Sequence, residues 1–304
     1  MLISVIVPCY NQKEKLRSLI SSLEKQVLPR SDFEVIVSDD GSTDGSVDLL
    51  QNYHGSLNLV PIIARGNAGR ARTRNAALSR IKGEYVLFLD GDMTADPALL
   101  ERHLHHLRLS EKTVCIGKVL PIAGQQKDLL SWYRVSRGAQ KLPAGTPLPP
   151  RYFTTNNSSM PFDLLKGAVP FNEDYKAWGG EDQELGYRLA RCGARFVFIE
   201  KALSSHDHAE SLPEYLHKIN HYGRTGLNLL LRNCPEHADC GVMRFFLSRN
   251  PVTRTALNLF FSKPVYWVCL GLAGKMPSKT AAFRLFDYLT YCNIFHALKE
   301  RAHA

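Results

Sequence analysis

The sequence contains acidic residues whose spacing is suited to metal binding or catalysis, and the first such group is Asp90-Gly91-Asp92. This triplet directly follows the apolar run that ends at Leu89, and carboxylates at the end of a buried strand indicate a cation or a polar ligand. Carboxylate oxygens are ligands that Mg²⁺ and Mn²⁺ prefer, so the pair suits a metal that bridges a diphosphate. Gly91 lets the backbone approach a ligand closely. Because Asp-Gly-Asp also forms turns, a purely structural role is the alternative.

A second acidic pair closes the sequence Trp178-Gly-Gly-Glu181-Asp182, at the predicted start of a helix over 182–192. The helix dipole favours acidic residues at a helix N-terminus, so capping alone explains the pair. A carboxylate on a glycine-hinged loop beside an aromatic ring is also what a general base for a hydroxyl group requires. Such a base must be ionised near neutral pH and must reach the hydroxyl.

Histidines follow the predicted strand over 194–199, in the sequence Ser205-His206-Asp207-His208. A histidine just beyond a sheet edge can complete a metal site whose other ligand is Asp92. A lone histidine is more often structural. Spacing alone does not choose between His206 and His208.

Polar residues also end the first two predicted strands, at Pro8-Cys9-Tyr10-Asn11 and at Asp39-Asp40-Gly41-Ser42-Thr43-Asp44. In an open parallel sheet, ligands bind beyond the carboxyl ends of the strands. There a tyrosine can pack on a base, and an aspartate can accept a hydrogen bond from a base N–H. The second segment also makes a good turn and helix N-cap, which is the structural alternative.

These polar segments need a scaffold, which the hydrophobic periodicity predicts. Apolar runs predict strands over 3–8, 33–38, 59–64 and 84–89. Helical spacing predicts a helix after each of the first three strands. This alternation predicts the α/β class, with a mostly parallel sheet covered by helices on both faces. Four prolines over 143–150 predict a loop, and the segment after 213 is mainly helical by pattern.

The composition fits a folded protein with one domain and an appendage, or with two modest domains. The chain has 304 residues, of which 44% are hydrophobic and 22% are charged. No basic leader precedes the first strand, from which we expect a cytoplasmic protein. Seven scattered cysteines without a CxxC pair predict reduced thiols. Cys234, His237 and Cys240 offer only three soft ligands, so ordinary loop residues are a simpler interpretation than zinc.

Positive charge is concentrated in the C-terminal segment. The net charge is +9, and from Pro213 onward there are 12 Lys and Arg against 5 Asp and Glu. Large aromatic residues such as Tyr266-Trp267 lie among these cations. Such a segment suits an anionic membrane surface or an anionic acceptor, and a helical appendage with a solvated basic face explains it equally. Its most apolar part, 256–274, is interrupted by Lys263-Pro264, so a segment that lies on a membrane is more credible than one that crosses it.

In their order along the chain, these motifs resemble the family 2 glycosyltransferases with a GT-A fold. The resemblance rests on 4–11, 35–44, 67–75, Asp90-Gly91-Asp92 and Gly180-Glu181-Asp182, and it covers about residues 2 to 210. It implies a catalytic domain over 1–212 and a helical extension over 213–304. The implied enzyme is inverting and moves a hexose or N-acetylhexosamine from a UDP-sugar to a hydroxyl of a glycan or lipid-linked glycan, forming a β-linkage.

The resemblance also implies a role for each matching residue. Asp182 is the general base, and Asp92 and His206 bind Mn²⁺ or Mg²⁺. The residues implied to bind the donor are Pro8, Tyr10, Asp40, Asn67, Arg72, Asn75, Asp90 and Gly91. Those implied to contact the acceptor are Trp178, Asn157 and Glu181. The Trp-Gly-Gly-Glu-Asp form is similar to that of galactosyl- and N-acetylgalactosaminyl-transferases, and for Asn157 a polar turn before a strand is the alternative.

Other functions on a similar sheet predict different features. An NAD-dependent oxidoreductase needs G-x-G-x-x-G after the first strand, where Pro-Cys-Tyr-Asn stands instead. A nucleotidyltransferase also uses carboxylates and a metal, but it would release pyrophosphate and not a nucleoside diphosphate. A non-catalytic sugar-binding protein would bind a nucleotide sugar without turnover. None of the motifs predicts a nucleic acid as partner.

Overall fold

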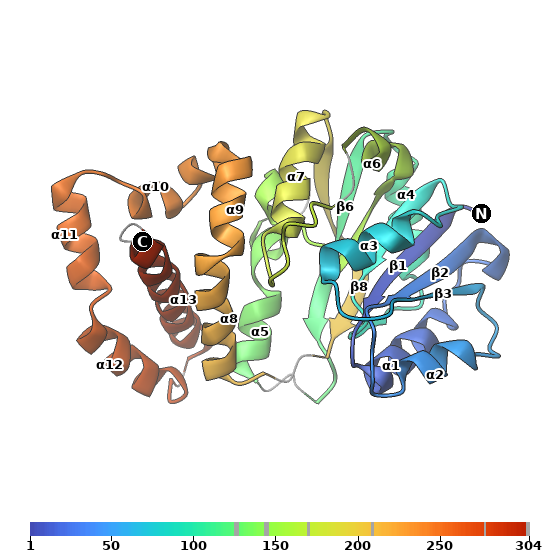
Figure 1. The fold of residues 1–304 in the computed structure, drawn as a ribbon, viewed down its shortest axis with the longest axis horizontal. Coiled ribbons are helices and arrows are strands. Elements are labelled where there is room, and N and C mark those ends of the chain that lie inside the picture. Colours follow the sequence, from blue (N-terminus) through green and yellow to red (C-terminus); the bar gives the residue numbers. More distant parts are fainter. Residues whose placement is uncertain (125–127, 143–145, 169–170, 208–209, 277, 302–304) are drawn as a thin grey trace. The chain divides into compact units, whose positions relative to one another are not determined.

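The computed structural model describes residues 1–124, 128–142, 146–168, 171–207, 210–276 and 278–301. The chain forms two compact units, whose elements are labelled in Figure 1. Unit 1 consists of Met1–Gln125, Val135–Lys176 and Glu181–His208. Unit 2 consists of Gln126–Arg134, Ala177–Gly180 and Ala209–Ala304. The predicted functional division into 1–212 and 213–304 stays a prediction, since unit 2 also takes in two short stretches from earlier in the chain.

Unit 1 is built on an eight-stranded sheet with the order β3-β2-β1-β4-β7-β6-β8-β5. Its strands are β1 (Ile3–Cys9), β2 (Phe33–Asp39), β3 (Leu59–Ile63), β4 (Tyr85–Leu89), β5 (Met93–Ala95), β6 (Thr113–Pro121), β7 (Asn157–Pro161) and β8 (Arg195–His206). The four predicted strands, β1 to β4, pair in parallel. β7 and β5 run antiparallel to their neighbours. The predicted α/β class with a mostly parallel sheet is therefore confirmed.

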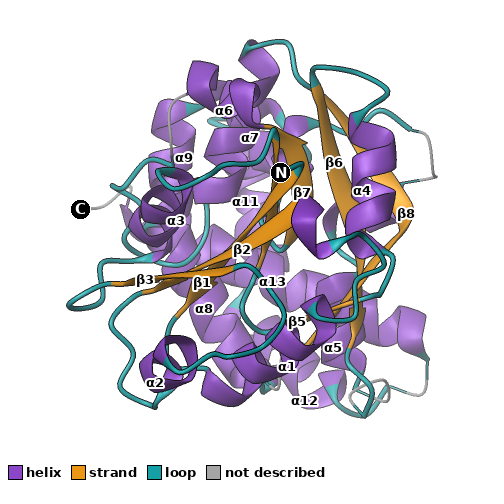
Figure 2. Cartoon of the chain, turned by 90° about the vertical axis from the view of Figure 1, so that its right-hand side faces the viewer, coloured by secondary structure: helices purple, strands orange, loops and turns teal. Residues whose placement is uncertain are grey.

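Helices cover both faces of this sheet (Figure 2). The α-helices that lie wholly in unit 1 are α1 (Lys13–Leu23), α2 (Ser46–Gln51), α3 (Arg70–Leu78), α4 (Leu99–Leu107), α6 (Phe162–Ala168) and α7 (Glu181–Arg191). Successive side chains of a strand point to opposite faces. Val5 and Val7 accordingly pack in one core with leucines of α1 and α4. Ile6 packs in the other core with residues of α3, α6 and α7.

Short 3-10 helices and a connecting α-helix complete the region between the main elements. They are η1 (Arg30–Asp32), α5 (Leu129–Val135), η2 (Gly138–Lys141) and η3 (Pro150–Tyr152). Part of the predicted loop over 143–150 falls at 143–145, which lies outside the described residues. Within that loop Leu148 forms a single antiparallel bridge with Phe196 of β8.

Unit 2 is helical. Its later elements are α8 (Leu212–Arg224), α9 (Gly226–Asn233), η4 (Pro235–Asp239), α10 (Met243–Phe246), α11 (Pro251–Phe260), α12 (Lys263–Ala273) and α13 (Lys279–Arg301). Its core centres on Tyr133, whose ring lies edge-on to Phe286 at 5.2 Å and to Tyr215 at 6.1 Å. The predicted C-terminal helices are thus present.

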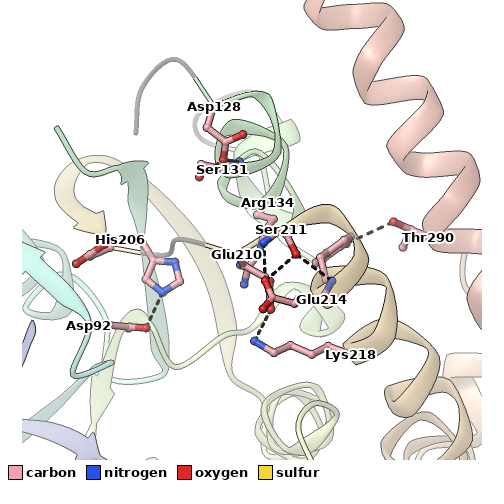
Figure 3. Close-up of polar contacts among 12 residues, drawn as sticks. Asp92, Asp128, Ser131, Arg134, His206, Glu210, Ser211, Glu214, Lys218 and Thr290 are labelled. Atoms are coloured by element: carbon pink, nitrogen blue, oxygen red, sulfur yellow. Dashed lines mark hydrogen bonds and ion pairs between the residues drawn. The ribbon is translucent and has the colours of Figure 1, made fainter. Parts of the chain in front are cut away.

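The start of α8 is fixed by polar contacts that Figure 3 draws. Ser211 and Glu214 form a capping box, in which each side chain accepts a hydrogen bond from the other residue's backbone N–H. The preceding Glu210 pairs with Arg134 at 2.7 Å and with Lys218. These contacts join α5 and α8 within unit 2.

No single helix in the described part of the chain is long and apolar enough to cross a membrane. Only together are α11 and α12 long and apolar enough for a span, and the pair is bent by 43° at its break. Phe261 and Ser262 separate the two helices, and Pro264 lies in the first turn of α12. The interruption predicted at Lys263-Pro264 therefore coincides with the break.

Candidate active site

Asp90 of the first acidic pair and both members of the second pair meet at one buried cation, Arg74 of α3. Its Nη2 lies 3.0 Å from Oδ1 of Asp90, and its Nη1 lies 3.3 Å from Oε1 of Glu181. Oδ1 of Asp182 is 3.7 Å from the same Nη1. The Arg74 side chain is only 2% exposed. A single guanidinium therefore joins the end of β4 to the start of α7, although the two are about ninety residues apart in sequence.

Helical spacing explains why Arg74 points inward. Ala71 lies three residues before it and Leu78 four residues after it, and both are buried on the same face of α3. A buried guanidinium is stable only when carboxylates pair with it. Burial lowers the pKa of Arg74, but the charges of Asp182, Asp90 and Glu181 outweigh burial and raise the pKa above its usual value. Arg74 therefore stays charged.

Arg74 was not among the residues predicted from the sequence, where Arg72 was the arginine expected to contact the donor. Arg72 lies two residues away on α3 and is exposed, so it takes no part in this cluster. The signal was present in the sequence, because Ala71, Arg74 and Leu78 recur at helical spacing. An arginine on the apolar face of a predicted helix indicates buried carboxylate partners.

Asp182 lies in the first turn of α7, where Thr155 holds both of its carboxylate oxygens. The backbone N–H of Thr155 donates to Oδ2 at 3.2 Å, and its hydroxyl donates to Oδ1 at 3.0 Å. Burial and the charge of Glu181 raise the pKa of Asp182 to about 7, with Arg74 opposing the rise and Asp90 adding to it. The side chain remains 23% exposed. Asp182 can therefore gain and lose a proton near neutral pH and is accessible, as a general base requires.

Two atoms of the cluster are buried without a hydrogen-bond partner among the described residues. They are Oε2 of Glu181 and Nε of Arg74. An unsatisfied buried polar atom is costly, and such atoms are uncommon in folded proteins. An acceptor and a donor of this kind in one cluster are suited to a polar ligand such as a sugar hydroxyl.

Asp92 and His206 form a second polar site, drawn in Figure 3. β5 pairs antiparallel with β8, with Met93 opposite His206, so Asp92 comes to lie beside the end of β8. Nε2 of His206 is 3.2 Å from Oδ2 of Asp92. The backbone N–H of Asp207 donates to the Asp92 carbonyl at 2.9 Å and fixes this arrangement. β8 runs through to His206, farther than the predicted strand over 194–199.

The electrostatics of Asp92 differ from those of Asp182. Burial on its own would raise the pKa of Asp92, but the hydrogen bond and charge of His206 lower it below its usual value. Lys15 and Arg70 add positive charge and act in the same direction. Asp92 is therefore ionised at neutral pH, as a metal-binding carboxylate must be.

The chemistry of these two side chains fits an open divalent-metal site. Among the described residues no group of three or more His, Cys, Asp or Glu could hold a metal by itself. Mg²⁺ in phosphate-transfer sites, however, is commonly held by one or two carboxylates, with substrate phosphates and water as the other ligands. Asp92 and His206 would be the protein ligands in such a site. His208, the alternative to His206, lies outside the described residues.

The residues predicted at the ends of β1 and β2 lie at the sheet edge but perform different tasks. Asp40 is buried, and its two oxygens accept hydrogen bonds from the N–H groups of Ala68 and Gly69, both at 2.9 Å. Asp40 thereby shapes the turn that leads into α3. Tyr10 is 47% exposed and can pack on a ligand.

Glycine at position 91 is required by packing. A Cβ there would lie 2.9 Å from the Pro8 carbonyl oxygen and would also collide with the side chain of Gln12. Because no larger residue fits, Gly91 lets the Asp90–Asp92 segment pass close to the end of β1.

Two asparagines predicted near the donor, Asn67 and Asn75, differ in their surroundings. Asn67 is exposed. Asn75 donates from Nδ2 to the Phe171 carbonyl at 2.8 Å and to Glu173 at 2.9 Å, and its Oδ1 accepts from the Phe171 N–H at 2.8 Å. The Asn75 side chain therefore holds the 171–173 segment, and the structure gives no support to donor binding through it.

Asn157 is fully buried, contrary to what a contact with the acceptor requires. Its Oδ1 is 2.9 Å from Nε2 of His103, and its Nδ2 donates to the Ala202 carbonyl at 3.0 Å. Burial lowers the pKa of His103 to about 4, so this network is neutral and structural at physiological pH. Within the polar stretch that drew attention to Asn157, Thr155 is the residue that contacts Asp182.

Trp178 is half-buried in unit 2, where its ring lies edge-on to Tyr222 at 6.1 Å. The following Gly179 has a φ of +95°, and a Cβ there would lie 2.8 Å from the Tyr222 ring. Gly180 also has a positive φ, of +101°. The glycine pair is thus explained by backbone geometry and by packing. The acceptor role of Trp178 stays a prediction.

Comparison with known proteins places this site in context. Residues 4–161, just over half of the chain, match the model of the Glycosyl transferase family 2. The chain is 28% identical over 251 residues to the uncharacterized glycosyltransferase YfnE of Bacillus subtilis, covering 67% of this chain and 64% of that protein. It is 43% identical over 93 residues to the poly(ribitol-phosphate) β-N-acetylglucosaminyltransferase TarS of Staphylococcus aureus, covering 30% of this chain and 16% of TarS. It thus spans less than two thirds of either relative.

Solved structures show the same fold. TarS 1–349 from S. aureus in complex with UDP-GlcNAc superposes with a TM-score of 0.59 at 19% identity, covering 100% of this chain and 92% of that one. The mannosyltransferase PcManGT from Pyrobaculum calidifontis, in complex with GDP-Man and Mn²⁺, has a TM-score of 0.61 at 20% identity, with 99% and 86% covered. At these identities the likeness concerns the fold alone.

Proposed function

The chain belongs to glycosyltransferase family 2, and from this premise we propose that it is an inverting enzyme that uses a UDP-sugar. It transfers a hexose or N-acetylhexosamine to a hydroxyl of a glycan or lipid-linked glycan and forms a β-linkage. The coarser conclusion, that the chain is a glycosyltransferase with the GT-A fold, rests on the family match and the structural neighbours. The donor, the acceptor and the residue roles are the proposed part.

The observation that carries the proposal is the convergence of Asp90, Glu181 and Asp182 on the buried Arg74. This arrangement keeps a partly exposed carboxylate, Asp182, with a pKa of about 7. Transfer to a hydroxyl requires such a base, because the hydroxyl must lose its proton as its oxygen attacks. Simple capping of α7 would not need a buried arginine from α3.

The reaction is a single displacement at the anomeric carbon of the donor sugar. Asp182 accepts the proton of the acceptor hydroxyl while the hydroxyl oxygen forms a bond to the anomeric carbon. The bond from that carbon to the diphosphate oxygen breaks, and its electron pair leaves with the nucleoside diphosphate. Attack from the face opposite the leaving group converts an α-linked donor into a β-linked product.

The donor side of the site rests on Asp92 and His206. When bound there, Mn²⁺ or Mg²⁺ supplies positive charge that stabilises the departing diphosphate. UDP-sugars are proposed as donors because TarS structures contain UDP and UDP-GlcNAc. Other donor contacts are proposed for Pro8, Tyr10, Asp40, Asn67, Arg72, Asp90 and Gly91. Asp40 would then serve two purposes, since its oxygens already hold the 68–69 turn.

On the acceptor side, Glu181 and Trp178 are the proposed contacts. Glu181 has a buried carboxylate oxygen without a partner among the described residues, which a sugar hydroxyl could satisfy. Relatives named as poly(ribitol-phosphate) glycosyltransferases and a chondroitin synthase support a polymeric acceptor. The chain covers only 16% to 34% of those relatives, so the resemblance does not identify which polymer this chain would modify.

A thermal-shift screen of nucleotide sugars with and without Mn²⁺ tests the proposal. A ligand bound only by the folded state raises its stability by mass action, by about 2.7 kcal/mol at a concentration 100 times Kd. We expect stabilisation by one UDP-sugar, increased by Mn²⁺. Product analysis with an acceptor should then show free UDP, whereas pyrophosphate would indicate a nucleotidyltransferase. Binding without turnover across an acceptor panel would indicate a sugar-binding protein, and no response to any nucleotide sugar would refute the proposal.

A further inference from the structure

The outer side of α11 and α12 is apolar and exposed. Large apolar side chains that are each at least 59% exposed make up what we call the α11–α12 surface: Val252, Leu259, Phe260, Trp267 and Val268. Val252 and Leu259 are seven residues apart and share one face of α11. None of the ten residues of α11 is buried. Scattered apolar side chains are ordinary on a protein surface, but a group on two consecutive helices marks an interaction site.

On their other side, α11 and α12 pack against α13 (Figure 1). Phe261, at the break between α11 and α12, is buried against Cys292 and Phe295. The Phe261 carbonyl is 2.7 Å from Nε2 of His296, and Lys299 donates to Asn258 of α11 at 3.0 Å. The two helices are therefore anchored on α13. Phe260 also touches this anchor, since its ring lies 5.2 Å from that of Tyr288, whereas the other four residues of the surface are each at least 63% exposed.

The chain segment that carries this surface has charges of a single sign. Residues 241–286 contain seven Lys and Arg and no Asp or Glu. Arg254 on α11, Lys263 at the start of α12 and Lys275 just after it are all exposed. Long basic side chains beside exposed aromatic and aliphatic ones match an interface whose inner part is hydrocarbon and whose outer part is anionic.

We propose that the α11–α12 surface binds the face of an anionic lipid bilayer. The apolar side chains enter the boundary between headgroups and acyl chains, and Trp267 takes the interfacial position that tryptophan favours. Arg254 and Lys263 contact the anionic headgroups. The enzyme is thereby held at a membrane, which for the proposed function favours an acceptor carried on lipid.

Charge and geometry select this occupant over the alternatives. A second copy of the chain would place two clusters of Lys and Arg against each other, and like charges at an interface oppose association. A dissolved polyanion would satisfy the cations but would leave Trp267 and Leu259 in water. α11 and α12 have ten and eleven residues, and a membrane-spanning helix needs about 20. The 43° bend suits helices that lie along a surface.

Sedimentation of the full chain with lipid vesicles tests the inference. Vesicles of phosphatidylcholine alone are compared with vesicles that also contain phosphatidylglycerol, at low and high salt. We expect the bound fraction to increase with phosphatidylglycerol and to fall as salt screens the charges. Emission from Trp267 should be quenched by brominated acyl chains, with a Trp267→Phe variant identifying its share. No nucleotide sugar is present, so the result is independent of whether the proposed function holds.

Paired variants separate the contribution of the apolar side chains to vesicle binding from that of the basic side chains. Leu259→Ser with Trp267→Ser should lower partitioning about tenfold, because each removes a side chain that the bilayer buries. Arg254→Glu with Lys263→Glu should lower it about tenfold on anionic vesicles only. Leu109→Ser and Lys25→Glu are matched controls in unit 1, since Leu109 is 71% exposed and Lys25 is exposed. All variants should keep the wild-type melting temperature.

Two outcomes would overturn the inference. One is binding that does not depend on phosphatidylglycerol or that the paired variants leave unchanged. The other is concentration-dependent self-association that the Leu259→Ser and Trp267→Ser pair abolishes, with no vesicle binding, which would identify a second copy as the occupant.

Discussion

Asp182 and Asp92 are carboxylates of the same unit, each paired with a basic side chain, yet their pKa values shift in opposite directions. Asp182 shares Arg74 with Asp90 and Glu181, so three acidic groups divide one positive charge. Asp92 has His206 at 3.2 Å, and Lys15 and Arg70 add to the positive charge around it. The pKa of Asp182 is raised to about 7, whereas that of Asp92 is lowered.

This difference in the ratio of acidic to basic groups is consistent with a different chemical task proposed for each carboxylate. A carboxylate that is protonated and deprotonated near neutral pH can accept a proton, and one that stays ionised can hold a cation. Pairs of titratable groups with diverging pKa values are typical of active sites. The opposite pKa shifts therefore support the proposal of Asp182 as the base and Asp92 as the metal ligand. Substitutions at either site test this proposal.

The largest effect is expected for Asp182→Asn. Asparagine can still accept the hydrogen bond from the Thr155 hydroxyl, and Arg74 keeps Asp90 and Glu181, so the fold is preserved. Loss of a general base lowers transfer by about 10² to 10⁴. Turnover and UDP-sugar affinity should be measured together, and affinity should be nearly unchanged.

Asp163→Asn is a matched control, because this carboxylate on α6 is 86% exposed and should not affect transfer. Turnover of Asp182→Asn within about tenfold of wild type, less than a general base contributes, would remove Asp182 from the role.

At the second carboxylate, His206→Ala should weaken Mn²⁺ binding about 100-fold in the presence of UDP. The physical reason is the loss of a nitrogen ligand next to Asp92. Electron paramagnetic resonance of bound and unbound Mn²⁺ measures this without any turnover. His54→Ala, at an exposed histidine, should leave Mn²⁺ affinity as in wild type. Equal affinity in both variants would contradict the assignment of the metal site.

Arg74→Met should lower the free energy of unfolding by about 3 to 5 kcal/mol, because it leaves the buried Glu181 and the partly exposed Asp90 and Asp182 without their shared cation. Urea denaturation measures the change. Arg72→Met is the matched control two residues away, and its exposed side chain should cost no more than about 0.5 kcal/mol. A similar loss for both variants would mean that Arg74 is not the centre of the cluster.

The smallest effect is expected for Glu181→Gln, as a shift in the pH dependence of transfer. The charge of Glu181 raises the pKa of Asp182, so its removal should lower that pKa. Since deprotonated Asp182 is the proposed active form, the acid limb of kcat/KM should move to lower pH. Glu101→Gln, at an exposed residue of α4, should not move it. A shift to higher pH would contradict the electrostatic roles assigned here.

Much of unit 1 could be predicted because its signals are local. Apolar runs that end in polar residues identified β1 to β4, and the resemblance supplied the GT-A fold that the structural neighbours confirm. The alternation of strands and helices also placed Asp90, Asp92 and Asp182 at element ends. Each of these conclusions depends on neighbours within one element or one motif.

What could not be predicted depends on contacts between distant segments. Asn75 was expected near the donor and Asn157 near the acceptor. In the structure the side chain of Asn75 bonds to Phe171 and that of Asn157 to His103, and both partners come from elsewhere in the chain. Arg74 was passed over because the carboxylates that stabilise it lie 16 and 107 residues away. Periodicity alone could have shown that Arg74 faces inward, but not which residues it meets.

The pH dependence of kcat/KM for the wild-type enzyme tests the assignment of Asp182 most directly. Because the deprotonated carboxylate accepts the proton, activity should rise with pH and level off above an apparent pKa of about 7. Measuring the affinities for the UDP-sugar and for Mn²⁺ over the same pH range shows whether the rise in activity comes from Asp182 or from a change in donor binding. A limb near 3.8, the ordinary value for aspartate, or activity that does not change around neutral pH would contradict the assignment.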